Sequence, residues 1–106
     1  MKTINMYYVK DMVEEKCITT LLPASNHLTA CLGFRNAYIT NKENKIPYKN
    51  LKMICCGQFL VNENGEYTQD VSYPHWELPG SEVIGFIRDQ IADKGLDDGF
   101  LDEEDE

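Results

Sequence analysis

The residue types best suited to chemistry in this chain are its thiols and imidazoles: Cys17, Cys31, Cys55, Cys56, His27 and His75. Such groups bind zinc, form disulfides or act as nucleophile and base when their spacing brings them together. The sequence contains no C-x-x-C pair, and neither histidine stands at a ligand-like interval from a cysteine. Adjacent Cys55 and Cys56 would point to opposite faces of a strand. We therefore expect no metal and no cofactor, and we expect reduced, mostly buried thiols that act as small apolar side chains.

The remaining catalytic patterns are also missing from the sequence. Neither histidine is placed in a recognised order with a serine, a cysteine or an aspartate. The neighbouring carboxylates Glu14-Glu15 and Asp97-Asp98 are better interpreted as solvated charge than as an acid–base pair. No glycine loop suited to a phosphate group is present. We therefore expect a protein that is not an enzyme.

Residues 40–50 and the position just after them form a lysine-rich stretch. Its charged side chains are Lys42, Lys45, Lys49, Lys52 and the single acid Glu43, which gives a local charge of +3. Positive charge is what a phosphate backbone requires, and the rings of Tyr48 and Phe59 are of the kind that stack on unpaired bases. The candidate site for single-stranded DNA is therefore Lys42, Lys45, Tyr48, Lys49 and Lys52. The alternative is that these lysines are merely solvated and the aromatic residues belong to the core.

The acidity of the chain is concentrated at its C-terminal end. Residues 97–106 hold seven of the 18 acids and no base, while the other 96 residues carry eleven acids and ten bases. The net charge of −8 therefore belongs mostly to an acidic tail, which we expect to be disordered. Within it, Phe100 and Leu101 form an apolar pair that is a candidate partner-binding element. The tail would occupy the lysine-rich loop in place of nucleic acid, dock on a basic partner protein, or simply aid solubility.

The elements that position these groups begin with an apolar run at residues 51–61. Pro47 lies before the run and Asn64-Gly65 lies after it, and Asn-Gly is typical of a tight hairpin turn. The pattern predicts a long central strand that pairs with a return strand at 66–73. Alternation places one set of side chains on one face, namely Leu51, Met53, Cys55, Gly57 and Phe59. Lys52 and Gln58 indicate that the other face is wetter, and Gly57 indicates a bulge or a close backbone approach.

Further elements follow from residue type and period. Residues 3–9 and Cys17–Leu22 have strand composition, and Pro23 is expected to close the second of these strands. Ser25 or Asn26 offers an N-cap for an amphipathic helix that runs to Ile39. A loop at 74–79 contains the only tryptophan. A second helix begins at Ser81 or Glu82 and ends before Lys94-Gly95.

These elements predict an α+β fold. We expect a small antiparallel sheet of three to four strands with one or two helices on one face. With 42% hydrophobic residues, the chain is too apolar to be disordered, so residues 1–95 are expected to form a single globular domain and 96–106 a tail. A homodimer would form through a sheet edge at 3–9 or 66–73.

Membrane and export segments are not expected. No stretch approaches the roughly 20 apolar residues that a membrane-spanning helix requires. The beginning of the chain lacks the apolar core of a secretory signal, and free thiols suit a reducing cytoplasm.

Several short motifs occur in a recognisable order along the first two thirds of the chain: Tyr7-Tyr8-Val9-Lys10-Asp11, Pro23, Ala30 with Phe34, Pro47-Tyr48, and Gly57-Gln58-Phe59 followed by Asn64-Gly65-Glu66. This order resembles the small non-structural protein of gokushoviruses, which are single-stranded DNA phages of the microvirus group. The chain departs from that pattern in its lysine-rich loop, in the Trp76 segment and in its acidic tail.

The resemblance implies a phage accessory protein that is absent from the virion and acts in the cytoplasm of the infected host. It would act in replication or packaging of a single-stranded DNA genome, by binding that DNA or a replication or capsid protein. The resemblance implies no catalytic residues. The alternative is a small interaction module or an inhibitor of a basic host protein, without contact to nucleic acid.

Overall fold

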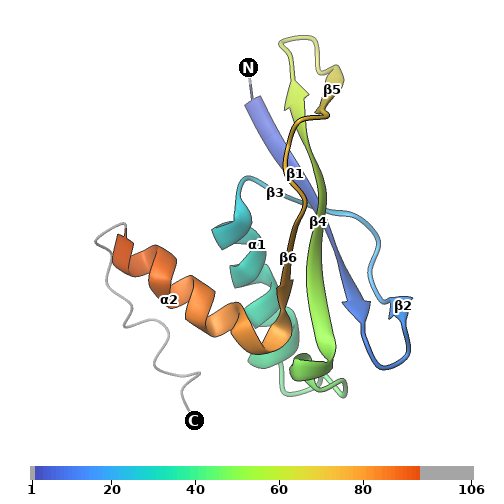
Figure 1. Ribbon diagram of the computed structural model, residues 1–106, viewed down its shortest axis with the longest axis vertical. Coiled ribbons are helices and arrows are strands. Elements are labelled where there is room, and N and C mark those ends of the chain that lie inside the picture. Colours follow the sequence, from blue (N-terminus) through green and yellow to red (C-terminus); the bar gives the residue numbers. More distant parts are fainter. Residues whose placement is uncertain (1, 94–106) are drawn as a thin grey trace.

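The centre of the structure is one long antiparallel pair of strands. The computed structural model describes residues 2–93, and in it β1 (Lys2–Asp11) lies along β4 (Leu51–Val61) over the full length of both strands. Lys2 is opposite Val61 at one end, and Asp11 is opposite Leu51 at the other. β4 has the limits that its apolar composition predicts. Every other strand pairs with one of these two (Figure 1).

Short strands complete a six-stranded sheet. β2 (Lys16–Cys17) and β3 (Leu22–Ala24) both pair with β1, while β5 (Tyr67–Asp70) and β6 (Trp76–Pro79) both pair with β4. The α+β class and the antiparallel sheet are confirmed. The expected count of three to four strands is too low, because each edge of the sheet consists of two short segments.

Two of the predicted elements are wrong. The single strand expected at Cys17–Leu22 is divided between β2 and β3, and Pro23 lies in the middle of β3. An edge strand tolerates proline because an outward position needs no backbone donor. The loop expected at 74–79 contains β6, which pairs with Lys52–Cys55 of β4. Pro74 lies shortly before this strand and Pro79 is its last residue, so the two prolines do not prevent a strand from forming.

The β4–β5 hairpin forms where Asn-Gly predicts it, with a longer loop. Residues 62–66 connect the strands, and only Gly65 takes positive φ, at 80°. The side-chain oxygen of Asn62 accepts the backbone N–H groups of Asn64 at 2.8 Å and Glu66 at 3.0 Å. The connection is therefore a five-residue loop and not a tight two-residue turn. Hydrogen bonds to the side chain of Asn62 stabilise this loop.

A β-bulge interrupts β4 next to Gly57, which is one of the two features that this glycine predicts. Met6 is opposite Gly57 and Tyr7 is opposite Cys55, so Cys56 has no residue opposite it. The extra residue inverts the alternation of the strand. Phe59, opposite Ile4, therefore lies on the face away from Cys55, and the prediction that it shares a face with Leu51 is wrong.

Both α-helices lie on one side of the sheet (Figure 1). α1 (His27–Phe34) begins at the N-cap Asn26, whose side-chain oxygen accepts the backbone N–H of Thr29 at 2.8 Å. It continues as a π-helical turn, η1 (Arg35–Ile39). A short 3-10 turn, η3 (Gly80–Glu82), leads into α2 (Val83–Asp93). No helix within residues 2–93 has the length and apolar character needed to cross a membrane.

The core lies between these helices and the sheet. Its buried members come from both layers: Tyr7, Val9, Cys31, Phe34, Leu51, Met53, Cys55, Val83, Ile87 and Ile91. The strand members alternate along β1 and along β4 before the bulge. Neither α-helix covers the opposite face of the sheet.

Gly80 provides a test of the packing between η3 and the backbone of Tyr48 and Leu51. A Cβ atom at this position would overlap the carbonyl oxygen of Tyr48 and lie 3.1 Å from that of Leu51. We expect Gly80→Ala to lower the free energy of unfolding by about 2–4 kcal/mol, because backbone must move to admit it. Urea denaturation measures this change.

The matched control is Gly33→Ala in α1, where a Cβ meets no atom within 4 Å. This substitution is expected to stabilise the protein by up to about 1 kcal/mol through helix propensity. Equal stability of the two variants would contradict the packing described at Gly80.

Candidate functional site

The predicted lysine-rich site is only partly assembled in the structure. Lys42, Lys45 and Lys49 are exposed in the segment that precedes β4. Lys52 is half-buried on β4, and its Nζ lies 2.7 Å from Oε1 of Glu77 on β6. Hydrogen bonds from Lys52 and His75 lower the pKa of the Glu77 carboxyl to about 2, so the charge of Lys52 is compensated at neutral pH.

The ring of Tyr48 is not freely exposed beside the lysines. It is half-buried in the short 3-10 turn η2 (Tyr48–Asn50) and packs against the core. Its backbone carbonyl also faces Gly80. The loop therefore offers cations without an exposed aromatic partner. The other predicted element, Phe100 with Leu101, lies outside the described residues.

A second set of aromatic and basic side chains lies on the sheet face that the α-helices leave uncovered. We call it the open face, and it consists of Lys2, Ile4, Met6, Tyr8 and Lys10 from β1 with Lys52, Ile54, Phe59 and Val61 from β4. Directly opposite residues of an antiparallel pair share a face, so the register assigns this set. Ile54 is buried, and the other apolar members are half-buried.

The two rings of the open face are spaced along the strands. Phe59 is opposite Ile4, which is four residues from Tyr8 on β1. At about 3.3 Å per residue, the rings are separated by about 13 Å along the sheet. Lys2 and Lys10 lie beyond them at the two ends of β1. Sequence patterns do not identify Tyr8 or Lys10 as site residues, because only the strand register places them on the same face as Phe59.

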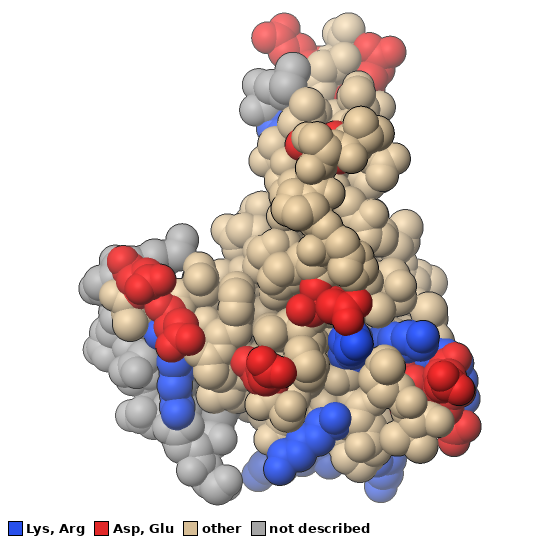
Figure 2. All heavy atoms as spheres, viewed as in Figure 1, with Lys and Arg blue, Asp and Glu red and all other residues tan. Residues whose placement is uncertain are grey.

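Charge is distributed unevenly over the molecule. On the face shown in Figure 2, Lys and Arg side chains gather in the lower part, whereas the projecting upper part ends in Asp and Glu. The acids of that upper part belong to the β4–β5 hairpin and include Glu63, Glu66 and Asp70. Beside them, Tyr67 is 64% exposed and Val71 is 90% exposed. The hairpin is thus an acidic arm with two exposed apolar side chains.

An extended hydrogen-bonded group surrounds His27, the first residue of α1. Its Nδ1 lies 2.7 Å from the hydroxyl of Tyr7, and its Nε2 lies 3.1 Å from the hydroxyl of Tyr73. The Asn5 amide donates to both hydroxyls, at 2.9 Å and 3.3 Å. The imidazole also stacks on Trp76 of β6, with ring centroids 4.0 Å apart and planes inclined by 6°. We call these five residues the His27 cluster.

The His27 cluster suits a neutral imidazole. A neutral ring has one donor and one acceptor nitrogen, and each meets a hydroxyl that can take the opposite role. Burial lowers the pKa of His27, and it raises the pKa of the Tyr7 and Tyr73 phenols. The cluster therefore connects β1, α1, the segment after β5, and β6 through uncharged contacts. Sequence patterns missed it because its hydrogen bonds to His27 span 20 and 46 residues.

Metal ligands and thiols are the other candidates for chemistry within residues 2–93. Within residues 2–93, no three His, Cys, Asp or Glu side chains gather as a metal site would require. Cys31 and Cys55 are buried, and burial raises the pKa of the Cys31 thiol to about 12. Cys17 and Cys56 are exposed, so the expectation of mostly buried thiols holds for only half of them.

Comparison with known proteins gives no assignment: no protein-family model, no curated protein and no solved structure matches the chain.

The His27 cluster predicts a pH dependence of stability. Because the pKa of His27 is lower in the folded state than its ordinary value of 6.5, the unfolded chain takes up a proton first as the pH falls. The contribution to stability is therefore present above about pH 6.5 and lost below it. We expect the free energy of unfolding to decrease from pH 7.5 to pH 5, as measured by urea denaturation.

The His27→Gln variant should be less stable at pH 7.5 and should lose most of this decrease. The control is His75→Gln, since the His75 ring lies outside the cluster and its side chain is 66% exposed. The interpretation fails if the decrease is the same in His27→Gln as in the unmodified protein.

Proposed function

We propose that this protein is a non-enzymatic binding protein that holds single-stranded DNA on its open face. The observation that supports the proposal is the combination of Tyr8 and Phe59 with lysines on the sheet face that neither α-helix covers. Aromatic rings on such a face stack with unpaired bases, while lysines neutralise the phosphates between them.

The spacing of the rings favours a single strand. Bases in a duplex are stacked on each other, so two separate rings contact bases only when the strand is unpaired and extended. A separation of about 13 Å suits two bases that are not adjacent in the strand. Lys2 and Lys10 then lie beyond the two rings, where the phosphates enter and leave the face.

The charge of the whole chain limits the affinity that this site can reach. The net charge is −8, and Lys52 is compensated by Glu77. Long-range attraction to DNA is therefore weak, and stacking must supply much of the binding free energy. We expect modest affinity with a shallow dependence on salt.

The biological setting that we propose follows from the resemblance to gokushovirus proteins. The protein would act in the cytoplasm of an infected bacterium, on single-stranded DNA during genome replication or packaging. Neighbouring genes for a microvirus capsid protein and a rolling-circle initiator would support this setting.

A second candidate is a protein-interaction module, and the acidic arm favours it. Glu63, Glu66 and the exposed ring of Tyr67 suit a basic partner, with charge guiding the encounter and the ring providing contact area. Self-association through the edge at 3–9 is less suitable, because β2 and β3 already pair with β1. The outer edge of β5 remains for such pairing.

Substitutions on the open face test DNA binding. We expect Tyr8→Ala and Phe59→Ala each to reduce the affinity for a short oligothymidylate by about 1–3 kcal/mol, since each removes a stacked ring. Tyr8→Phe keeps the ring and should bind as the unmodified protein does. Fluorescence anisotropy with a labelled oligonucleotide measures these affinities, and circular dichroism checks the fold.

Two double variants with equal charge changes then locate the phosphate contacts. Lys2→Gln with Lys10→Gln should reduce the magnitude of the logarithmic salt slope by about 1.4, or about 0.7 for each lost phosphate contact. Lys42→Gln with Lys45→Gln should change it little. A larger effect of the second pair would move the site to the lysine-rich loop. Absence of DNA binding by the folded, unmodified protein would reject the proposal and favour the acidic arm.

A further inference from the structure

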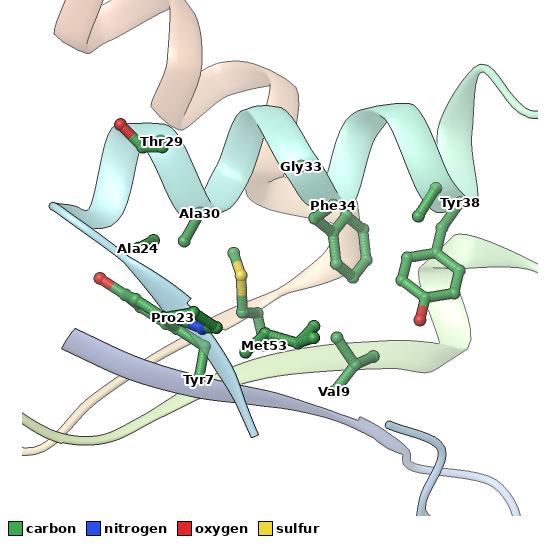
Figure 3. A pocket seen from close by; sticks show the side chains of 12 residues that line it. Tyr7, Val9, Pro23, Ala24, Thr29, Ala30, Gly33, Phe34, Tyr38 and Met53 are labelled. Carbon is green, nitrogen blue, oxygen red and sulfur yellow. The ribbon is translucent and has the colours of Figure 1, made fainter. Parts of the chain in front are cut away.

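The two central strands turn alternate side chains to opposite sides of the sheet. Val9 of β1 is opposite Met53 of β4, and both side chains point toward α1 (Figure 3). Tyr8, the neighbour of Val9 on β1, therefore points away from the helices. After the bulge at Cys56 the alternation of β4 is inverted, which brings Phe59 to the same side as Tyr8.

On β5 this side of the sheet carries Tyr67 and Gln69. Val61, a member of the open face, is directly opposite Tyr67. Phe59 is directly opposite Gln69. Directly opposite residues of an antiparallel pair share a face, so the side that binds DNA in the proposal above extends onto β5. Tyr67 thus adds a ring to the pair formed by Tyr8 and Phe59.

The ring of Tyr67 is more accessible than the other two. Tyr67 is 64% exposed, whereas Tyr8 and Phe59 are half-buried. A ring that is mostly exposed contributes little apolar burial to the fold. Its surface is therefore available to a ligand, and its replacement should have little effect on stability.

The charged residue of β5 lies on the other side of the sheet. Asp70 is opposite Gln58, whose amide donates to the side-chain oxygen of the buried Asn5 at 3.0 Å. Asn5 lies on the side that faces the helices, so Asp70 lies there too. In the loop before β5, the carboxylate of Glu66 accepts from the side-chain amide of Asn62 at 3.0 Å. On the open side, β5 therefore presents a ring and an amide and no charge.

The three rings follow an oblique line across the sheet. Tyr67 lies two residues from Gln69, so it is a diagonal neighbour of Phe59. Diagonal neighbours on adjacent strands are about 7–8 Å apart. Tyr8 lies about 13 Å from Phe59 and about 20 Å from Tyr67, measured along the strands at about 3.3 Å per residue. The line runs from β1 over β4 to β5.

The side chain of Gln69 does not stand between Phe59 and Tyr67. A Cβ atom at Gly57 would lie 3.3 Å from Nε2 of Gln69. Gly57 and Tyr67 lie on opposite sides of the Phe59–Gln69 pair along the strands. The amide of Gln69 is therefore directed away from Tyr67, into space that the glycine leaves free.

We propose that Tyr67 is a third stacking position for single-stranded DNA, so that the bound strand crosses the sheet obliquely from Tyr8 over Phe59 to Tyr67. Phe59 and Tyr67 contact neighbouring bases, whereas the strand is extended between Tyr8 and Phe59. The ligand is then a single strand of about four nucleotides or more. This inference rests on the DNA binding proposed for the open face.

The charge of the acidic arm determines how the contact at Tyr67 depends on salt. Glu63 and Glu66 repel phosphates, and β5 contains no lysine or arginine. The contact is therefore a stacked base without a phosphate partner. Its removal should lower the affinity and leave the logarithmic salt slope unchanged, in contrast to the removal of a lysine.

The test measures the affinity of the full chain for a labelled oligothymidylate of about eight nucleotides by fluorescence anisotropy. Tyr67→Ala should weaken binding about fivefold or more, as expected for the loss of one stacked base. Tyr67→Phe keeps the ring and should bind as the unmodified protein does. The matched control is Thr68→Ala, because Thr68 is an exposed neighbour on the same strand that faces the other side of the sheet. It should also bind as the unmodified protein does.

Tryptophan substitutions separate direct contact from an indirect effect. Tyr67→Trp should bind at least as tightly as the unmodified protein, and its fluorescence should fall on addition of DNA because the indole ring stacks on a base. Thr68→Trp should show no change beyond that of the unmodified protein, which contains only Trp76. Circular dichroism checks that each variant is folded.

The proposal is overturned if Tyr67→Ala binds normally while Tyr8→Ala and Phe59→Ala bind weakly. The open face would then bind DNA without Tyr67. It is also overturned if Thr68→Ala weakens binding as much as Tyr67→Ala, or if the fluorescence of Tyr67→Trp does not respond to DNA. Absence of binding by the unmodified protein would overturn both this inference and the proposed function.

Discussion

The bulge at Cys56 in the β1–β4 ladder is the constraint on which the rest of the structure depends. Up to Cys55, the residues of β4 that face the helices are apolar. Beyond the extra residue, Gln58 takes that side, and its amide donates to the side-chain oxygen of the buried Asn5 at 3.0 Å. The same inversion moves Phe59 to the open face. One unpaired residue thus separates an apolar core from the polar His27 cluster and also completes the aromatic pair on the other face.

The parts of the fold that the sequence predicts are those with local signals. The limits of β4 follow from an apolar run between a proline turn and a hairpin, and Asn26 caps α1 through a contact only three residues away. The strand β6 was missed because Pro74 and Pro79 are typical of a loop. Its pairing with β4 depends on contacts that no short window contains. The sequence predicts one strand in place of β2 and β3 because Cys17–Leu22 is a continuous run of strand-forming residues.

The candidate sites show the same division between local and distant information. Local composition identifies the lysine-rich loop, yet it cannot show that Tyr48 packs inward or that Lys52 meets Glu77. The open face depends on strand register, and one bulge changes its membership. The His27 cluster depends on how closely α1 approaches the sheet, which side-chain volumes in two layers decide together. Sequence reasoning therefore identified the kinds of residue more readily than their neighbours.

Tyr7 belongs to two parts of this molecule at once. Its ring is buried in the core between α1 and the sheet, and its hydroxyl lies 2.7 Å from Nδ1 of His27. Any movement of this ring changes the free energy of placing a proton on the imidazole. By thermodynamic linkage, protonation of the imidazole must then change the free energy of holding the ring in the core. The stack of His27 on Trp76, the only tryptophan, would give this coupling an optical signal within the protein itself.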